Sequence, residues 1–232
     1  MNSIEALKKK AGDFAASFVK SQMIVGLGEG STAVYATRKI GETYQSGEIT
    51  DIQCIPCSKN VETIAKSLGL PVSTLDEYPE IDITIDGADE VDPDLQLIKG
   101  GGGALLREKI VATASKREII IVDPRKLSDF LGEKWAVPIE IIPFSVRPVL
   151  NALQELGGRP EIRTNQENQN FITDENNYIV DCNFGLIKDP GKLSRQLKSI
   201  PGIVEHGLFI DLATDLVIAS PDGIEHRQKD LS

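Results

Sequence analysis

The chain has 232 residues, of which 41% are hydrophobic, as in ordinary globular proteins of one large or two smaller domains. It carries 35 acidic against 25 basic side chains. Such a surface repels phosphodiester backbones and anionic lipid, so we expect neither nucleic acid nor a membrane as a partner. An anionic substrate would need a local cluster of cations at its site.

The N-terminal segment and the hydropathy bear on where the protein resides. Residues 1–19 lack the apolar core of a signal peptide. No stretch approaches the roughly 18 consecutive apolar residues of a membrane-spanning helix. The sequence therefore predicts a soluble, cytoplasmic protein.

Helices and strands are expected to alternate through the first half of the chain. In order, the hydrophobic patterns predict a helix at 2–20, a strand at 23–28, a helix at 31–45 capped by Ser31 or Thr32, a strand at 51–57, a helix at 59–69 closed by Gly69, a strand from 81 that ends in an acidic loop at 92, a helix at 104–115 and a strand at 117–123. This alternation favours a parallel α/β sheet with crossover helices. Ligands of such sheets bind at the carboxyl ends of the strands.

The pattern changes near Gly132. The expected order is a strand at 134–143, a helix at 144–156, a strand at 159–164, a hairpin at 171–184 that turns at Asn176–Asn177, a helix at 190–200 and a strand at 202–209. This β-α-β-β-α-β order is the split ferredoxin-like arrangement. Residues 214–229 are expected to form two strands that return to the first domain. We therefore predict an α/β domain of residues 1–131 plus 209–232 and a smaller ferredoxin-like α+β domain of residues 132–208.

Three loops after predicted strands carry unusual chemistry. The first, Gly26–Thr32, places glycines where a strand turns into a helix, which suits a bound anion. It lacks both the G-x-G-x-x-G dinucleotide pattern and the Walker ending, so a tight structural turn is an equal alternative. Glu29 is awkward for an anion site unless its side chain points away or toward hydroxyls.

The second loop, Asp86–Asp92, holds four carboxylates within seven residues. The alternatives are a solvated acidic loop or a calcium site, but the spacing of an EF-hand is absent. Gly87 and Ala88 are small enough for the carboxylates of Asp86 and Asp89 to crowd one ligand. Carboxylates are good acceptors for sugar hydroxyls.

The third loop is the run Gly100–Gly103 that follows Lys99. Glycines permit positive φ and close approach of a ligand to the backbone, and four in a row are costly in chain entropy. On the helix that follows, Glu108 shares a face with apolar residues. A partly apolar setting raises the pKa of a carboxyl and suits it to general-base catalysis. The alternative is an ordinary exposed glutamate.

Cysteines and histidines offer weaker candidates. Cys54 and Cys57 form a C-x-x-C motif, which is found in redox and metal sites. No second such motif is present, and Cys54 lies in an apolar run where a buried thiol fits. His206 and His226 have no motif around them, so a structural or surface role is favoured for both.

Four motifs in register resemble the type A family of ribose-5-phosphate isomerases. They are GLGEGSTA, DGADEVD, KGGGGALLREK and VDPRKLSDFLG, and their order and spacing fit that family along nearly the whole chain. The family's fold is a Rossmann-like α/β domain with a smaller ferredoxin-like domain. The resemblance implies interconversion of ribose 5-phosphate and ribulose 5-phosphate without a metal or an organic cofactor, by a homodimer or homotetramer.

The resemblance also implies roles for individual residues. Glu108 matches the catalytic base, which would take the C2 proton of the open-chain aldose and return a proton at C1 through a cis-enediolate. Asp86 and Asp89 would hold hydroxyls and assist ring opening, and Lys99 would stabilise charge on the enediolate oxygen. The remaining expected substrate contacts are Lys8, Glu29, Gly30, Ser31, Thr32, Gly87, Ala88, Gly100, Gly101, Gly102 and Lys126.

Two positions depart from the family pattern. The family usually has Thr where this chain has Glu29. It commonly shows an Asp-Glu-Ser-Lys segment where this chain reads Asp123-Pro124-Arg125-Lys126. Both changes bear on substrate affinity more than on the type of reaction.

Two other functions remain as alternatives. One is a sugar-phosphate sensor, since related α/β domains serve as effector-binding modules, although this chain has no basic helix-turn-helix extension. The other is acyl-CoA transfer, which uses a glutamate on a related fold but would need a CoA site that the sequence does not indicate.

Overall fold

The computed structural model describes residues 4–229, and contacts divide them into two compact units. The first unit comprises residues 4–88, 107–126 and 212–229, and the second comprises residues 89–106 and 127–211. The second unit therefore includes residues 89–106, which the sequence pattern grouped with the first domain. The domain boundaries expected from the sequence stay a prediction.

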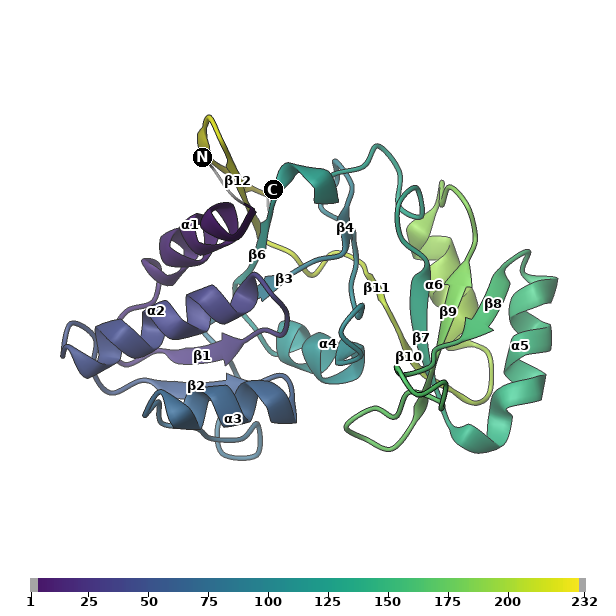
Figure 1. Cartoon of the computed structure of the whole chain (residues 1–232), viewed down its shortest axis with the longest axis horizontal. Coiled ribbons are helices and arrows are strands. Elements are labelled where there is room, and N and C mark those ends of the chain that lie inside the picture. The colour runs from purple at the N-terminus through teal and green to yellow at the C-terminus, as the bar shows by residue number, and fades with distance from the viewer. Residues whose placement is uncertain (1–3, 230–232) are drawn as a thin grey trace. The chain divides into compact units, whose positions relative to one another are not determined.

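The first unit is built on a six-stranded sheet with helices packed against it (Figure 1). Its elements are α1 (Ile4–Ala16), β1 (Ile24–Leu27), α2 (Ala33–Gln45), β2 (Gln53–Pro56), α3 (Lys59–Ser67), β3 (Ile83–Gly87), the larger part of α4 (Leu105–Thr113), β6 (Glu118–Val122), the 3-10 turn η1 (Pro124–Lys126), β12 (Asp215–Ser220) and β13 (Gly223–Gln228). The predicted alternation of helices and strands is confirmed. The first helix ends at Ala16 instead of residue 20, and its predicted start at residue 2 lies outside the described residues.

The strand order of this sheet is β13-β12-β6-β3-β1-β2, and all neighbours are parallel except β12 and β13. The predicted parallel sheet is therefore confirmed, with one antiparallel strand at its edge. From β1 the chain first moves to β2 on one side and then returns to β3 on the other. This reversal is a topological switch point, where the loops after β1 and β3 diverge and ligands of α/β sheets bind.

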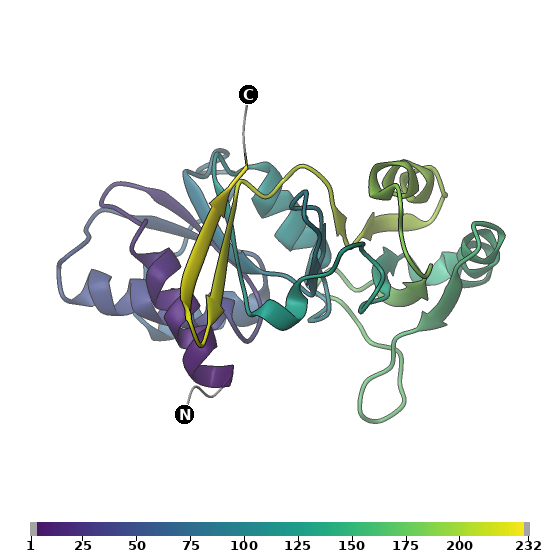
Figure 2. The same cartoon turned by 90° about the horizontal axis from the view of Figure 1, so that it is seen from above.

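Burial explains the composition of the central strands. All five residues of β6, Glu118–Val122, are buried, as expected of a parallel strand covered on both faces. On one face α1 packs tightly against α2, because a Cβ on Gly12 would lie only 2.7 Å from the backbone nitrogen of Ala36. Figure 2 shows the C-terminal strands, in yellow, beside α1, in purple.

An ion pair between the buried Asp215 and the half-buried Arg117 holds the C-terminal hairpin of β12 and β13 to the sheet. The carboxylate of Asp215 accepts hydrogen bonds from both Nε and Nη2 of Arg117, at 2.8 and 2.7 Å, and its Oδ1 lies 2.7 Å from Nε2 of His226. Burial alone would raise the pKa of Asp215. The hydrogen bonds from Arg117, Thr214, His226 and Gln228 outweigh it and hold that pKa well below its usual range.

We expect Asp215→Asn to lower the free energy of unfolding at pH 7 by about 3 kcal/mol, because it leaves Arg117 without its carboxylate. The depressed pKa means that this stabilisation is present above the unfolded pKa of about 4 and is lost as the pH falls toward the folded value. Urea unfolding at pH 7 and at pH 3 should therefore show a smaller difference between wild type and variant in acid. Asp13→Asn, which breaks only an exposed pair with Lys9, is the control and should change little. An equal difference at both pH values would contradict the assignment.

The second unit contains a four-stranded antiparallel sheet and a three-stranded one. Its elements are β4 (Glu90–Val91), β5 (Leu97–Ile98), β7 (Val137–Ile141), the 3-10 turn η2 (Pro143–Ser145), α5 (Val146–Glu155), β8 (Arg159–Ile162), β9 (Tyr178–Asn183), α6 (Pro190–Lys198), β10 (Ile203–His206) and β11 (Leu208–Phe209). The larger sheet has the order β10-β7-β9-β8, with α5 and α6 packed on the same apolar cluster. This arrangement confirms the predicted ferredoxin-like domain. The smaller sheet has the order β11-β5-β4.

Two predicted strands differ in the structure. The run 202–209 forms two strands in different sheets, β10 and β11, because the chain turns at Gly207. A Cβ there would lie 2.2 Å from the carbonyl oxygen of Lys99, so only glycine fits. In the predicted hairpin at 171–184 only the second half is a strand, and a single bridge joins Ile172 to Tyr178. Asn176 adopts a positive φ in the turn between them.

Candidate active site

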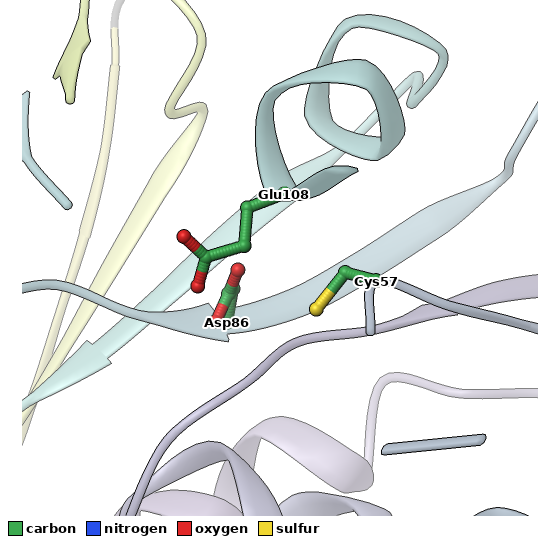
Figure 3. Close-up of side chains that lie close together, drawn as sticks. All are labelled: Cys57, Asp86 and Glu108. Atoms are coloured by element: carbon green, nitrogen blue, oxygen red, sulfur yellow. The ribbon is translucent and has the colours of Figure 1, made fainter. Parts of the chain in front are cut away.

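Two buried carboxylates and a thiol meet at the switch point of the first unit. Asp86 lies near the end of β3, Cys57 directly after β2, and Glu108 in the first turn of α4. Their exposed fractions are 1%, 0% and 5%, and one ligand atom of each lies within 4.8 Å of those of the other two. Figure 3 shows the carboxylate of Glu108 directed toward Asp86, with the sulfur of Cys57 directed toward the pair. The alternative of an exposed helical glutamate is therefore wrong for Glu108.

Glycine at position 28 allows the loop after β1 to reach Asp86. A Cβ at this position would lie 2.2 Å from Oδ1 of Asp86, so any other residue would displace that carboxylate. The same Oδ1 accepts a hydrogen bond of 2.7 Å from the backbone N–H of Gly87. This close approach gives the glycines of the first loop a specific purpose beyond a tight turn.

The side chain of Glu29 points toward the start of α3. Its Oε1 accepts a hydrogen bond of 2.9 Å from Nδ2 of Asn60, and its Oε2 accepts one from the hydroxyl of Ser58. Ser58 is the N-cap of α3 and accepts a hydrogen bond from the N–H of Val61. The carboxylate therefore lies at the positive end of a helix dipole. The negative charge of Glu29 is directed to these donors at the start of α3. A glutamate in this loop is therefore compatible with an anion bound by the loop's backbone.

We expect Glu29→Ala to raise KM for the substrate about fivefold with little change in kcat, because the loop loses two hydrogen bonds that hold it to α3, worth roughly 1 kcal/mol together at this partly exposed position. Steady-state kinetics measures the split. Glu48→Ala, on an exposed loop, is the matched control. A fall in kcat with unchanged KM would show that Glu29 acts on the reaction and not on the loop.

The same loop borders a pocket of about 280 Å³ in the first unit. Its lining residues are Gly28, Glu29, Gly30, Ser31, Val34, Thr37, Asn60, Val61 and Ile64. Gly30 has φ +116° and nothing near its missing Cβ, so the backbone is open on that side. Thr32 occupies the predicted N-cap of α2 but makes no side-chain capping hydrogen bond. The start of this helix therefore remains suited to an anion.

Lys8, Arg125 and Lys126 are basic residues of the first unit that the sequence relates to an anionic ligand, and their surroundings differ. Lys8, on α1, pairs with Glu5 at 2.9 Å, and Glu5 also accepts a hydrogen bond from Tyr35 of α2. Arg125 folds back on the buried Asp123, to which it donates from Nε at 2.8 Å and from Nη2 at 2.9 Å. This bidentate pair lowers the pKa of Asp123 and engages the extra charge of the Pro124–Arg125 segment. Lys126 ends the short turn η1.

In the second unit, the side chain of Asp89 is hydrogen-bonded to the backbone of the glycine run. Oδ2 of Asp89 accepts a hydrogen bond of 2.7 Å from the N–H of Gly101. A Cβ on Gly101 would lie 2.7 Å from the same carboxylate, so the approach requires glycine. Gly100 and Gly103 adopt the positive φ values anticipated for the run, +99° and +88°.

Lys99 is a buried cation at the start of this run. Its side chain is 2% exposed, and its Nζ lies 5.4 Å from the centre of the Phe209 ring, which is itself fully buried. A lysine at such depth is rare unless charge or hydrogen bonding compensates for it. Its position supports a role in chemistry more than a role at the surface.

Arg163, which follows β8, was not anticipated from the sequence. Its Nη1 donates to the carbonyl oxygens of Gly100 and Gly101, at 3.0 and 3.1 Å, and its Nε donates to Asp181 at 2.8 Å. The glycine run is therefore held in one conformation and is not a hinge. No local motif marks Arg163, because the two glycine carbonyls that it binds lie more than sixty residues earlier in the chain.

The remaining candidates have structural surroundings. None of the three cysteines forms a disulfide and all three are buried, and burial raises the pKa of Cys54 to about 12. His206 is 1% exposed, and its Nε2 lies 3.3 Å from Oγ of Ser194. His226 pairs with Asp215. Both histidines thus have the structural role favoured from the sequence. Among residues 4–229, no helix is long and apolar enough to cross a membrane.

In fold the chain is similar to solved sugar-phosphate isomerases. A D-ribose-5-phosphate isomerase in complex with phospho-erythronic acid matches it with a TM-score of 0.95 and 38% identity, over 97% of this chain and 99% of that one. Ribose 5-phosphate isomerase A from Methanocaldococcus jannaschii matches with a TM-score of 0.93 and 39% identity, over 98% of this chain and 100% of that one.

The sequence relatives agree with these structures. Residues 53–223 match the family model of ribose 5-phosphate isomerase A, also called phosphoriboisomerase A. Ribose-5-phosphate isomerase A of Chloroflexus aurantiacus is 50% identical over 97% of this chain and 94% of its own length. That of Desulfatibacillum aliphaticivorans is 48% identical over 97% of both chains. The chain belongs to the ribose 5-phosphate isomerase A family, and the sensor hypothesis is not favoured.

Proposed function

We propose that the protein is an aldose–ketose isomerase that interconverts ribose 5-phosphate and ribulose 5-phosphate. Membership of the family supports this activity. One structural observation supports the chemical mechanism. The buried carboxylates of Asp86 and Glu108 lie side by side at the switch point of an α/β sheet. Proton transfer between adjacent carbons of a sugar needs a positioned base of this kind.

In this proposal Glu108 is the general base. It removes the proton from C2 of the open-chain aldose, which leaves a cis-enediolate, and then delivers a proton to C1 to form the ketose. Asp86 holds a sugar hydroxyl and assists ring opening. Burial of Glu108 favours this role, because a carboxylate with little water around it is a stronger base than an exposed one.

The family resemblance also implies roles for residues of the second unit. Lys99 stabilises the negative charge that develops on the enediolate oxygen, and Asp89 holds a further hydroxyl. Gly100 to Gly102 present backbone to the sugar, in the conformation that Arg163 and Asp89 maintain. The buried position of Lys99 supports its role, since low polarity around the cation strengthens its field.

The phosphate would be bound by the first loop. Gly30, Ser31 and Thr32 lead into α2, a helix whose N-terminus has no capping side chain. Lys8 and Lys126 would supply the cations that an acidic protein needs for an anionic sugar. Glu29 contributes by holding the loop to α3 and not by contact with the phosphate.

Oligomeric state and cellular location are part of the proposal. A homodimer or homotetramer is inferred from the family, with the smaller domain as its interface. Phe144 in η2 is 96% exposed, and Leu186 in the same unit is 55% exposed, which supports an apolar contact there. Light scattering on the purified protein measures this directly. We also propose a cytoplasmic location.

One assay tests the activity. The purified protein, with EDTA present, should convert ribose 5-phosphate to ribulose 5-phosphate. The rate is measured as the appearance of this ketose. Because the proposed chemistry uses only side chains of this chain, EDTA should leave the rate unchanged. An absence of ketose, or a rate that depends strictly on an added metal, would overturn the proposal.

A further inference from the structure

The C-x-x-C motif has no part in the isomerase chemistry, yet its second cysteine lies beside the proposed base. Cys54 lies within β2, whereas Cys57 follows that strand and joins Asp86 and Glu108. Neither thiol is part of a disulfide and neither is exposed. Only one of them therefore belongs to a group of side chains that can share a ligand.

We propose that Cys57, Asp86 and Glu108 form an inhibitory site for thiophilic divalent cations, represented by Zn²⁺ and Cd²⁺. This inference rests on the proposed function for its inhibitory consequence, but the binding itself does not. Binding of such a cation would switch the enzyme off when the cation is abundant, and the cation takes no part in turnover.

The geometry suits a tetrahedral cation with an open position. Each of the three side chains offers one ligand atom, and these atoms lie within 4.8 Å of one another. Around zinc, with bonds of about 2.0 to 2.3 Å, neighbouring ligand atoms lie roughly 3.5 Å apart. Shifts of about an ångström in side chains would therefore close the site. Three protein ligands leave the fourth position for water.

The donor chemistry determines which cations bind. A thiolate is a soft ligand that favours zinc and cadmium, whereas magnesium and calcium prefer oxygen ligands alone. The site has only two carboxylates and is buried, which is too little oxygen for either of those ions. We therefore expect inhibition by Zn²⁺ and Cd²⁺ but not by Mg²⁺ at the same concentration.

The position of the cation explains the inhibition. A bound cation would engage an oxygen of Glu108 and one of Asp86, so Glu108 could no longer accept the C2 proton and Asp86 could no longer hold a hydroxyl. Sugar phosphate and cation would then compete for the same carboxylates. The expected kinetic pattern is a rise in the apparent KM with increasing Zn²⁺.

The experiment compares cysteine variants of the full chain without a histidine tag. Rates are measured after removal of EDTA, with added Zn²⁺ or Mg²⁺, and each is expressed relative to the same variant without metal. We expect Zn²⁺ to inhibit wild type and Cys54→Ser alike, and to require at least tenfold higher concentration for Cys57→Ser. Cys54 is the matched control because it belongs to the same motif and is equally buried.

A second measurement needs no activity. Binding of Cd²⁺ to a cysteine produces thiolate-to-metal absorption in the ultraviolet, which should saturate at one ion per chain in wild type. It should be lost in Cys57→Ser and should require more Cd²⁺ in Glu108→Gln. Absence of this absorption in wild type, or its persistence in Cys57→Ser, would overturn the site. Absorption in a protein that lacks isomerase activity would instead uphold the site and count against the proposed function.

Discussion

Glu108→Gln should still bind ribose 5-phosphate but lose about 10²- to 10⁴-fold in kcat, the contribution of a positioned general base. Glutamine has the same size and fills the same buried position beside Asp86. It cannot accept a proton from C2, so the loss falls on the chemical step. Isothermal titration with substrate measures binding, and formation of ribulose 5-phosphate measures turnover.

A matched control separates this effect from a general disturbance. Glu42→Gln changes the same atoms on α2, where the side chain is 65% exposed and pairs with Lys39 at 3.5 Å. That variant should keep the turnover of wild type, because exposed pairs contribute little. Incorporation of deuterium from solvent into the sugar gives a second readout, which should fall with kcat in Glu108→Gln. Turnover near that of wild type in Glu108→Gln would falsify the assignment of the base.

The second large effect is expected from Lys99→Met, which should lower kcat about 10²- to 10³-fold, as does loss of a donor to a developing oxyanion. Methionine keeps most of the length of the chain and its contact with Phe209 but removes the cation. The charge matters most in the enediolate, so kcat should fall more than KM rises. Steady-state kinetics in both directions of the reaction measures this split.

The control for Lys99 is a lysine with a solvated charge. Lys116→Met removes a side chain that is 61% exposed and pairs with Asp82 at 3.0 Å. It should change kcat by less than about twofold, because the ions of an ordinary buffer screen surface charges that lie more than a Debye length away. Circular dichroism confirms that both variants are folded. An effect of Lys99→Met on KM alone would indicate a binding role and contradict the proposed oxyanion contact.

The elements near the first part of the site follow from local patterns. In β6 four apolar residues follow Glu118 without interruption, and the glycines after β1 lead into a helix, so hydrophobic pattern and turn chemistry predict both elements. The spacing put Glu108 on an apolar face of its helix but left an exposed glutamate as the alternative, and its burial in the structure decides between the two. The parallel sheet and the ferredoxin-like order followed from the alternation of these elements.

Other features depend on partners that are distant in sequence. The strands β4, β5 and β11 have two residues each, too few for any alternation to mark them. Their pairing fixes them instead, since β5 pairs with strands on both sides. The approach of Cys57 to Glu108 depends on strand order, which no local pattern encodes. The direction of the Glu29 side chain depends likewise on Ser58 and Asn60.

The place of β12 in the first sheet has a consequence for how the chain folds during synthesis. This strand lies between β6 and β13, yet it is translated only after the whole ferredoxin-like segment. Until then β6 is paired with β3 on one side, and its other side is an open edge because β12 has not yet been made. The four strands of the other large sheet lie within residues 137–206 and require nothing later. The ferredoxin-like sheet can therefore form on the ribosome, while the sheet that carries Asp86 is completed only after residues 215–228 have been made.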